Sequence, residues 1–121
     1  MKNILLVEDD LFLIDIYKKK FEESGFQISV AQDGDEALKK VEEEKPDIML
    51  LDIILPNTDG WEILRKIKEN PESKNIKVVI LSNLGQKDEV EKGMKMGAAN
   101  YLIKAQFTPG EVVAAINKMI Q

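Results

Sequence analysis

Short apolar runs alternate with longer amphipathic segments along this chain of 121 residues. The short runs have the length and composition of strands that are buried on both faces of a parallel sheet. The longer segments carry apolar residues at the helical period, which is typical of helices that bury one face against a sheet. The pattern predicts strands at about 3–7, 26–30, 47–52, 76–82 and 100–103, alternating with helices at about 11–24, 34–44, 60–70, 86–96 and 109–120.

The first predicted helix has clear end signals and two groups of apolar residues. Asp10 can cap its N-terminus, and Gly25 can end it in the C′ position. Its core-facing stripe is predicted to consist of Leu13, Ile16, Tyr17 and Phe21. Leu11, Phe12 and Ile14 fall outside this stripe, and partial burial by a neighbouring loop explains them as well as partner docking does. Our hypothesis is that these three residues form part of a docking face.

Composition limits the possible functions. We expect one domain over residues 1–121, because this length supports one core and has no room for two. A net charge of -5 and a pI near 4.8 argue against direct nucleic-acid binding, since the chain repels phosphate backbones. The absence of cysteine suits a reducing compartment. The N-terminal apolar run is too short for a signal peptide or a membrane span, so we expect no membrane insertion and a cytoplasmic location.

The apolar runs end on residues that carry chemistry. Glu8 and Asp9 follow the first run, Asp52 the third, Ser82 the fourth and Lys104 the fifth. Because the carboxyl ends of parallel strands share one edge of a sheet, we expect these side chains to form one site. Carboxylate oxygens at this density suit Mg²⁺, while the ammonium and the hydroxyl suit phosphoryl oxygens. The set predicts a site for a divalent cation and a phosphoryl group.

In order and spacing, the chain resembles the receiver domain of bacterial two-component response regulators over its whole length. Asp9, Asp52, Ser82 and Lys104 are separated by 43, 30 and 22 positions, as in that family. The other matching features are Glu8, the pairs Leu55-Pro56, Asp59-Gly60 and Gly97-Ala98, and the aromatic residue Tyr101. Within this family, the chain resembles the chemotaxis-type receiver, which is a stand-alone single domain. The resemblance implies an α/β, flavodoxin-like, doubly wound (βα)5 fold whose five-stranded parallel sheet has the order 2-1-3-4-5.

The resemblance implies a phosphorelay function for the strand-end site. Asp52 would accept a phosphoryl group from a phosphohistidine on a sensor histidine kinase or a histidine phosphotransfer protein. Mg²⁺ would be held by Asp9, Asp52 and the backbone carbonyl of Ile54, with Glu8 acting through a water molecule. The resemblance also implies that the protein is not an enzyme that acts on other substrates. It would catalyse only its own phosphorylation and its own slow dephosphorylation.

The same resemblance implies how the signal leaves the site. Ser82 and Lys104 would hold the acyl phosphate, and Tyr101 would turn inward as the loop that carries Ser82 closes. The surface made by the fourth helix, fifth strand and fifth helix would then bind a downstream effector protein. We expect a monomer, with dimerisation on phosphorylation as a further option. Leu11, Phe12 and Ile14 would contribute to docking of the kinase.

Several positions depart from the family pattern. Ala105 and Gln106 precede Phe107 where the family has Pro-Phe, so we expect a trans Lys104-Ala105 bond. Gly93 stands where alanine is usual, which predicts that Gly93→Ala raises stability.

The residues beside the site depart as well. Asn83 is bulkier than the usual residue after the hydroxyl and could crowd the entrance. Ile54 and Leu84 are apolar where a polar side chain could orient water, which predicts slow self-dephosphorylation.

Three other functions compete with this interpretation. A haloacid dehalogenase-type phosphatase also forms a phosphoaspartate, but it carries a second aspartate two residues after the nucleophile, where this chain has Ile54. A flavodoxin-like nucleotide binder needs a glycine-rich phosphate loop, and Gly34, Gly60 and Gly85 are isolated. The third alternative is a phosphorylation-independent interaction module on the same fold, which usually lacks members of the site.

Overall fold

A parallel sheet forms the centre of the protein. The computed structural model describes residues 2–120, and Met1 and Gln121, the two ends of the expected domain, lie outside the described residues. The sheet has five strands in the order β2-β1-β3-β6-β7, which confirms the flavodoxin-like order predicted for the five main strands. Their bounds are β1 Asn3–Val7, β2 Gln27–Ala31, β3 Ile48–Leu51, β6 Lys77–Ser82 and β7 Asn100–Ile103. The structure adds a short antiparallel pair that the pattern did not predict, β4 Ile54–Leu55 and β5 Thr58–Asp59.

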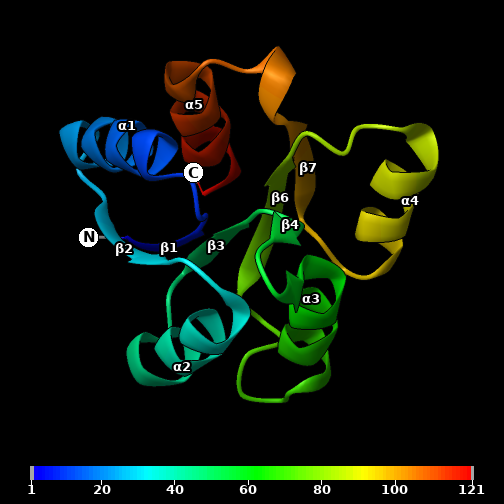
Figure 1. Ribbon diagram of the computed structural model, residues 1–121. Coiled ribbons are helices and arrows are strands. Elements are labelled where there is room, and N and C mark those ends of the chain that lie inside the picture. The colour runs from blue at the N-terminus through cyan, green and yellow to red at the C-terminus, as the bar shows by residue number, and fades with distance from the viewer. Residues whose placement is uncertain (1, 121) are drawn as a thin grey trace.

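Helices cover both faces of the sheet (Figure 1). They are α1 Leu11–Glu23, α2 Gly34–Glu44, α3 Gly60–Glu69, α4 Lys87–Lys95 and α5 Pro109–Met119, with a 3-10 turn, η1, over Lys104–Gln106. Helices α1 and α5 lie together on one face, and α2 and α3 lie on the other, with α4 beside β7. Within residues 2–120, none of the helices has the length and apolar character needed to cross a membrane.

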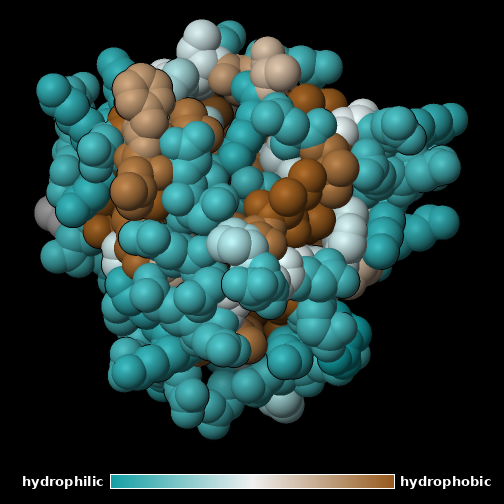
Figure 2. Space-filling model, in the orientation of Figure 1, coloured by the Kyte–Doolittle hydropathy of each residue, from teal (hydrophilic) through white to brown (hydrophobic). Residues whose placement is uncertain are grey.

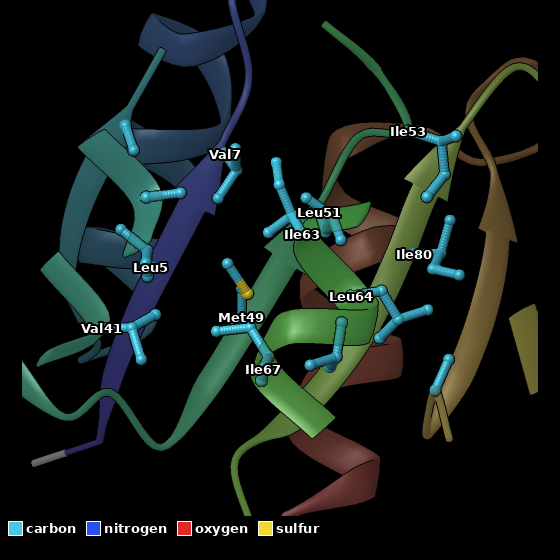
Figure 3. Packing of buried hydrophobic residues seen from close by; sticks show 14 of the residues in the cluster. Leu5, Val7, Val41, Met49, Leu51, Ile53, Ile63, Leu64, Ile67 and Ile80 are labelled. Atoms are coloured by element: carbon cyan, nitrogen blue, oxygen red, sulfur yellow. The ribbon is translucent and has the colours of Figure 1, made fainter. Parts of the chain in front are cut away.

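Two apolar layers hold the helices to the sheet. Successive residues of a strand point to opposite faces, so a continuous apolar strand can contribute to both layers. Leu5, Met49 and Ile80 face α2 and α3, whereas Leu6 and Leu50 face α1 and α5. Figure 3 shows the first layer, in which strand side chains face those of α3. These layers fix the strand ends, and therefore the side chains that follow them, in one place.

The first helix begins and ends where its signals predict. The Oδ1 atom of Asp10 accepts hydrogen bonds from the backbone N–H groups of Phe12 at 2.9 Å and Leu13 at 3.2 Å, as an N-cap does. Gly25 follows the helix with a φ of 87°, a conformation that glycine adopts without the penalty of a Cβ atom. Both end signals are confirmed.

The predicted faces of α1 are partly wrong. Ile14 is buried in the layer shared with α5, together with Tyr17 and Phe21, so it does not lie outside the core stripe. Leu13 and Ile16, which were expected in the stripe, are only half-buried. Tyr17 and Phe21 confirm part of the predicted stripe, and the buried face extends to Ile14 because α5 and the sheet together decide which residues are covered.

The surroundings of Gly93 give a reason to expect the opposite effect of Gly93→Ala on stability. Gly93 is buried where α4 approaches the sheet, and a Cβ atom there would lie 2.6 Å from Cδ1 of Ile80 and 3.0 Å from Cδ2 of Tyr101. Ile80 is fully buried, so its side chain has little freedom to move away. The glycine allows this close packing, and the helix propensity of alanine does not decide the effect of a substitution.

Candidate functional site

The predicted strand-end residues lie around one pocket. Glu8 and Asp9 follow β1, Asp52 follows β3, Ser82 ends β6 and Lys104 follows β7. All five line an open pocket of about 290 Å³ at the carboxyl edge of the sheet. The remaining lining residues are Asp10, Leu13, Ile54 and Asn83. Tyr101 is not among the lining residues, and Ile14 is in the core.

Three carboxylates of the pocket converge. One oxygen from each of Glu8, Asp9 and Asp52 lies within 4.8 Å of the other two. Glu8 and Asp52 are buried, with 2% and 7% of their surface exposed, whereas Asp9 is exposed at the pocket entrance. Two buried carboxylates are costly unless positive charge compensates them. Hard oxygen donors at this separation fit a Mg²⁺ ion that retains some of its water.

Lys104 supplies the positive charge in the described structure. Its Nζ atom lies 2.7 Å from Oδ2 of Asp52 and also forms a short ion pair with Oε1 of Glu8. Burial by itself disfavours the ammonium, but the hydrogen bonds from Lys104 to Asp52 and Glu8 outweigh it and raise the pKa of Lys104. Burial raises the pKa of Glu8, and the hydrogen bond from Lys104 opposes this only in part. The pocket therefore favours the protonated form of Glu8 more than water does.

The loop after β3 orients the carboxylate of Asp52. Its Oδ1 atom accepts a hydrogen bond of 3.0 Å from the backbone N–H of Ile54, while Oδ2 contacts Lys104. The loop then passes so close to α3 that a Cβ atom on Gly60 would lie 2.4 Å from Cα of Ile53. Only glycine fits this contact. The contact explains why the Asp59-Gly60 pair contains a glycine, which the sequence alone did not explain.

The hydroxyl and aromatic residues are linked through Leu84. The Oγ atom of Ser82, which is fully buried, accepts a 3.3 Å hydrogen bond from the backbone N–H of Leu84. The hydroxyl of Tyr101 donates a short hydrogen bond to the carbonyl of Leu84. Tyr101 is 8% exposed, so its ring already lies inward, against the space left by Gly93.

Sequence reasoning missed the role of Asn83. Its Oδ1 atom accepts a 3.1 Å hydrogen bond from the backbone N–H of Ala105, which lies in η1. The sequence indicated only that Asn83 is bulky, and no local signal connects two residues that are 22 positions apart. Residues 2–120 contain no cis peptide bond, so the Lys104-Ala105 bond is trans, as expected.

Exposed apolar side chains lie at the start of α1 and in β4, two elements that contribute lining residues to the pocket. Leu11 and Phe12, at the start of α1, are 65% and 73% exposed, and Ile54 in β4 is 57% exposed. Figure 2 shows apolar surface over α1 and a second apolar area near β4, with polar surface between them. Two of the three residues predicted for a docking face are thus accessible, and Ile14 is not.

Comparisons with known proteins agree with the geometry of this pocket. The family described as the response regulator receiver domain matches residues 4–117. The chemotaxis protein CheY of Thermotoga maritima is 34% identical over 120 residues, which cover 98% of this chain and 97% of that protein. The transcriptional regulatory protein PhoP of Bacillus subtilis is 34% identical over 99% of this chain. The chain spans about half of PhoP, because the match covers 49% of that protein.

Solved structures show the same fold. A putative response regulator from Chloroflexus aurantiacus superimposes with a TM-score of 0.89 at 26% identity, covering 98% of this chain and 97% of that one. The Mn²⁺-bound form of the response regulator Rcp1 superimposes with a TM-score of 0.87 at 29% identity, covering 99% and 94%. The acidic pocket formed by Glu8, Asp9 and Asp52 fits a phosphoryl-accepting aspartate. The family match over residues 4–117, on this fold and with this pocket, shows that the chain belongs to the response regulator receiver domains.

Proposed function

We propose that Asp52 accepts a phosphoryl group from a phosphohistidine on a sensor histidine kinase or a histidine phosphotransfer protein. The observation that carries this proposal is the placement of the Asp52 carboxylate in an open pocket, 2.7 Å from the Lys104 ammonium and beside two further carboxylates. An oxygen of Asp52 would attack phosphorus as the bond to the imidazole nitrogen breaks, and the imidazole would leave. Position and charge neutralisation are the main requirements of such a transfer.

Mg²⁺ fits the donor set of the pocket. Asp9, Asp52 and the backbone carbonyl of Ile54 would hold the ion, and Glu8 would reach it through a water molecule. When bound, the ion supplies positive charge that reduces repulsion between the carboxylates and an incoming phosphoryl group. The exposed position of Asp9 at the entrance supports this arrangement, because an ion that keeps several waters needs an open side.

Ser82 and Lys104 would hold the product. In the described structure the ammonium of Lys104 is shared by Asp52 and Glu8. A phosphoryl group on Asp52 would offer charged oxygens to that ammonium and to the hydroxyl of Ser82. The loop after Ser82 is hydrogen-bonded to Tyr101 through Leu84, so a movement at the pocket reaches the surface of α4, β7 and α5.

This surface would control a downstream effector protein, and the protein itself would act as a signalling switch in the cytoplasm. The absence of cysteine suits a reducing compartment. We propose a single receiver domain that is monomeric before phosphorylation and can dimerise after it. Direct contact with nucleic acid is not part of the proposal, because the net charge of -5 disfavours it.

Intact-mass measurement tests the assignment of Asp52. The protein is incubated with acetyl phosphate in the presence and absence of Mg²⁺. We expect a Mg²⁺-dependent gain of one phosphoryl group that is lost in Asp52→Asn. Asp59→Asn is the matched control, because Asp59 lies outside the pocket and caps α3 through the N–H of Trp61, a role that asparagine can also fill. Absence of any gain in the wild type would favour the phosphorylation-independent interaction module.

We further propose that Leu11 and Phe12 contact the phosphohistidine donor. Both are exposed next to the pocket, and apolar surface of this kind is typical of helix docking. The double variant Leu11→Ser, Phe12→Ser should slow transfer from the cognate donor while transfer from acetyl phosphate stays unchanged. A donor rate equal to that of the wild type, in a folded variant, would refute the docking role.

A further inference from the structure

Hydrogen bonds fasten the loop between β6 and α4 to its neighbours. The N–H of Ala105 donates to Oδ1 of Asn83 at 3.1 Å, and the hydroxyl of Tyr101 donates to the carbonyl of Leu84. The bond to Leu84 belongs to the switch already described. The bond between Asn83 and Ala105 joins the chain just after Ser82 to the chain just after Lys104, the two residues proposed to hold the phosphoryl group.

The hydrogen bond between Asn83 and Ala105 is not needed to satisfy buried polar groups. Asn83 and Ala105 are both exposed, so water could satisfy either group. The N–H of Ala105 belongs to the first turn of η1, where backbone donors have no partner within the turn. The side chain of Asn83 supplies an acceptor from a different loop, although holding it in one rotamer reduces its conformational freedom.

The bond also continues the pairing of two strands beyond their ends. In the sheet register Ser82 is paired with Ile103, and Lys104 follows directly. Beyond this pair, the side chain of Asn83 accepts a hydrogen bond from the backbone N–H of Ala105, in the place where a paired strand would supply a backbone carbonyl. This restrains the ends of β6 and β7 relative to each other at the position from which Ser82 and Lys104 enter the pocket.

We propose that Asn83 and Ala105 form a latch that positions Ser82 and Lys104 relative to Asp52 before the phosphoryl donor binds. Asn83 is thus a positioning residue whose acceptor oxygen acts through the turn that carries Lys104. The latch rests on the function proposed for Asp52, Ser82 and Lys104. Proline at position 105 could not form it, because proline has no backbone N–H.

The test measures the rate of phosphorylation by acetyl phosphate at saturating Mg²⁺, using intact mass over time. Asn83→Leu removes the acceptor at similar volume and should slow the reaction by about two- to tenfold, the range that one exposed hydrogen bond can supply. Mg²⁺ affinity from calorimetry should not change and the thermal midpoint should fall by only a few degrees, which separates positioning from loss of the metal site or of the fold.

The same substitution is then measured in the background of Ala105→Pro, which lacks the donor. Proline also restricts the backbone of Lys104, so the informative quantity is the further effect of Asn83→Leu in that background. A latch predicts no further slowing. An equal slowing by Asn83→Leu with and without the Ala105 N–H would overturn the proposal.

Asn83→Ala distinguishes the latch from crowding and remains available if Ala105→Pro does not fold. Crowding of the entrance predicts a faster reaction for Asn83→Ala and a normal one for Asn83→Leu. The latch predicts that both are slower than the wild type, and equal rates for the wild type and both variants would also refute it. Failure of the proposed function is a different result, since then the wild type itself would gain no phosphoryl group.

Discussion

The Nζ atom of Lys104 lies 2.7 Å from Oδ2 of Asp52, so the proposed phosphoryl acceptor is paired with an ammonium group. The same ammonium contacts Glu8, and the side chain of Lys104 is only 12% exposed. One ammonium therefore contacts two buried carboxylates and can balance only one of their two negative charges. If Mg²⁺ binds as proposed, it shares these acidic residues with Lys104, so removal of the lysine should affect both stability and metal binding.

Lys104→Met should lower the free energy of unfolding by about 2 kcal/mol in Mg²⁺-free buffer, because it leaves two buried carboxylates unpaired at the edge of an open pocket. Saturating Mg²⁺ should restore part of this loss, and the variant should bind Mg²⁺ more tightly than the wild type. Urea denaturation and calorimetry measure the two effects.

Lys87→Met provides the control for this experiment. Lys87 is 88% exposed and forms only a 4.0 Å ion pair with Glu91. Its replacement should change stability by less than about 0.5 kcal/mol. Similar losses in the two variants would contradict the special position of Lys104.

The raised pKa of Glu8 predicts a pH dependence of stability. Because the folded protein binds the Glu8 proton more tightly than the unfolded chain does, this group contributes most below its ordinary pKa of 4.5. The contribution is lost as the pH rises through the raised pKa of the folded state. Glu8→Gln should remove this component from the stability profile measured without Mg²⁺. Mg²⁺ should lower the apparent pKa of Glu8, which a carboxyl-detected NMR titration can follow.

Two glycines on helices should respond in opposite ways to alanine. Gly93→Ala should lower stability by about 1 kcal/mol, since overpacking against Ile80 and Tyr101 exceeds the gain in helix propensity. Gly110→Ala should raise stability by about 0.5–1 kcal/mol, because the nearest atom to its Cβ would be Oγ1 of Thr108 at 4.0 Å. Thermal unfolding of both variants is the measurement. Stabilisation by Gly93→Ala would show that Ile80 moves aside.

The phosphorylated form should have a long lifetime. Ile54 lines the pocket and presents an exposed apolar side chain where an attacking water would need orientation. Ile54→Gln should shorten the lifetime of the phosphoryl group, and Leu11→Gln, on the outer surface, should not. Loss of the added mass over time reports both. Decay of the wild-type phosphoprotein within seconds would contradict this prediction.

The order of strands and helices followed from local patterns in the sequence, because apolar period and helix-end residues act over a few neighbouring positions. Asp10 and Gly25 mark the ends of α1 through such local contacts. Ile14 shows the limit of this reasoning. Its burial depends on how α5 and the sheet are placed around α1, and no residue near it in the sequence reports that.

The sequence by itself determined that acidic, hydroxyl and basic residues follow the strands of one parallel sheet, since strand periodicity places them at a common edge. Only the tertiary structure decided how they pair. Lys104 meets Asp52 and Glu8 across 52 and 96 positions of the chain, and Asn83 meets Ala105 across 22. Packing of distant segments sets these contacts, as it sets the space around Gly93, so propensities of single residues could not predict them.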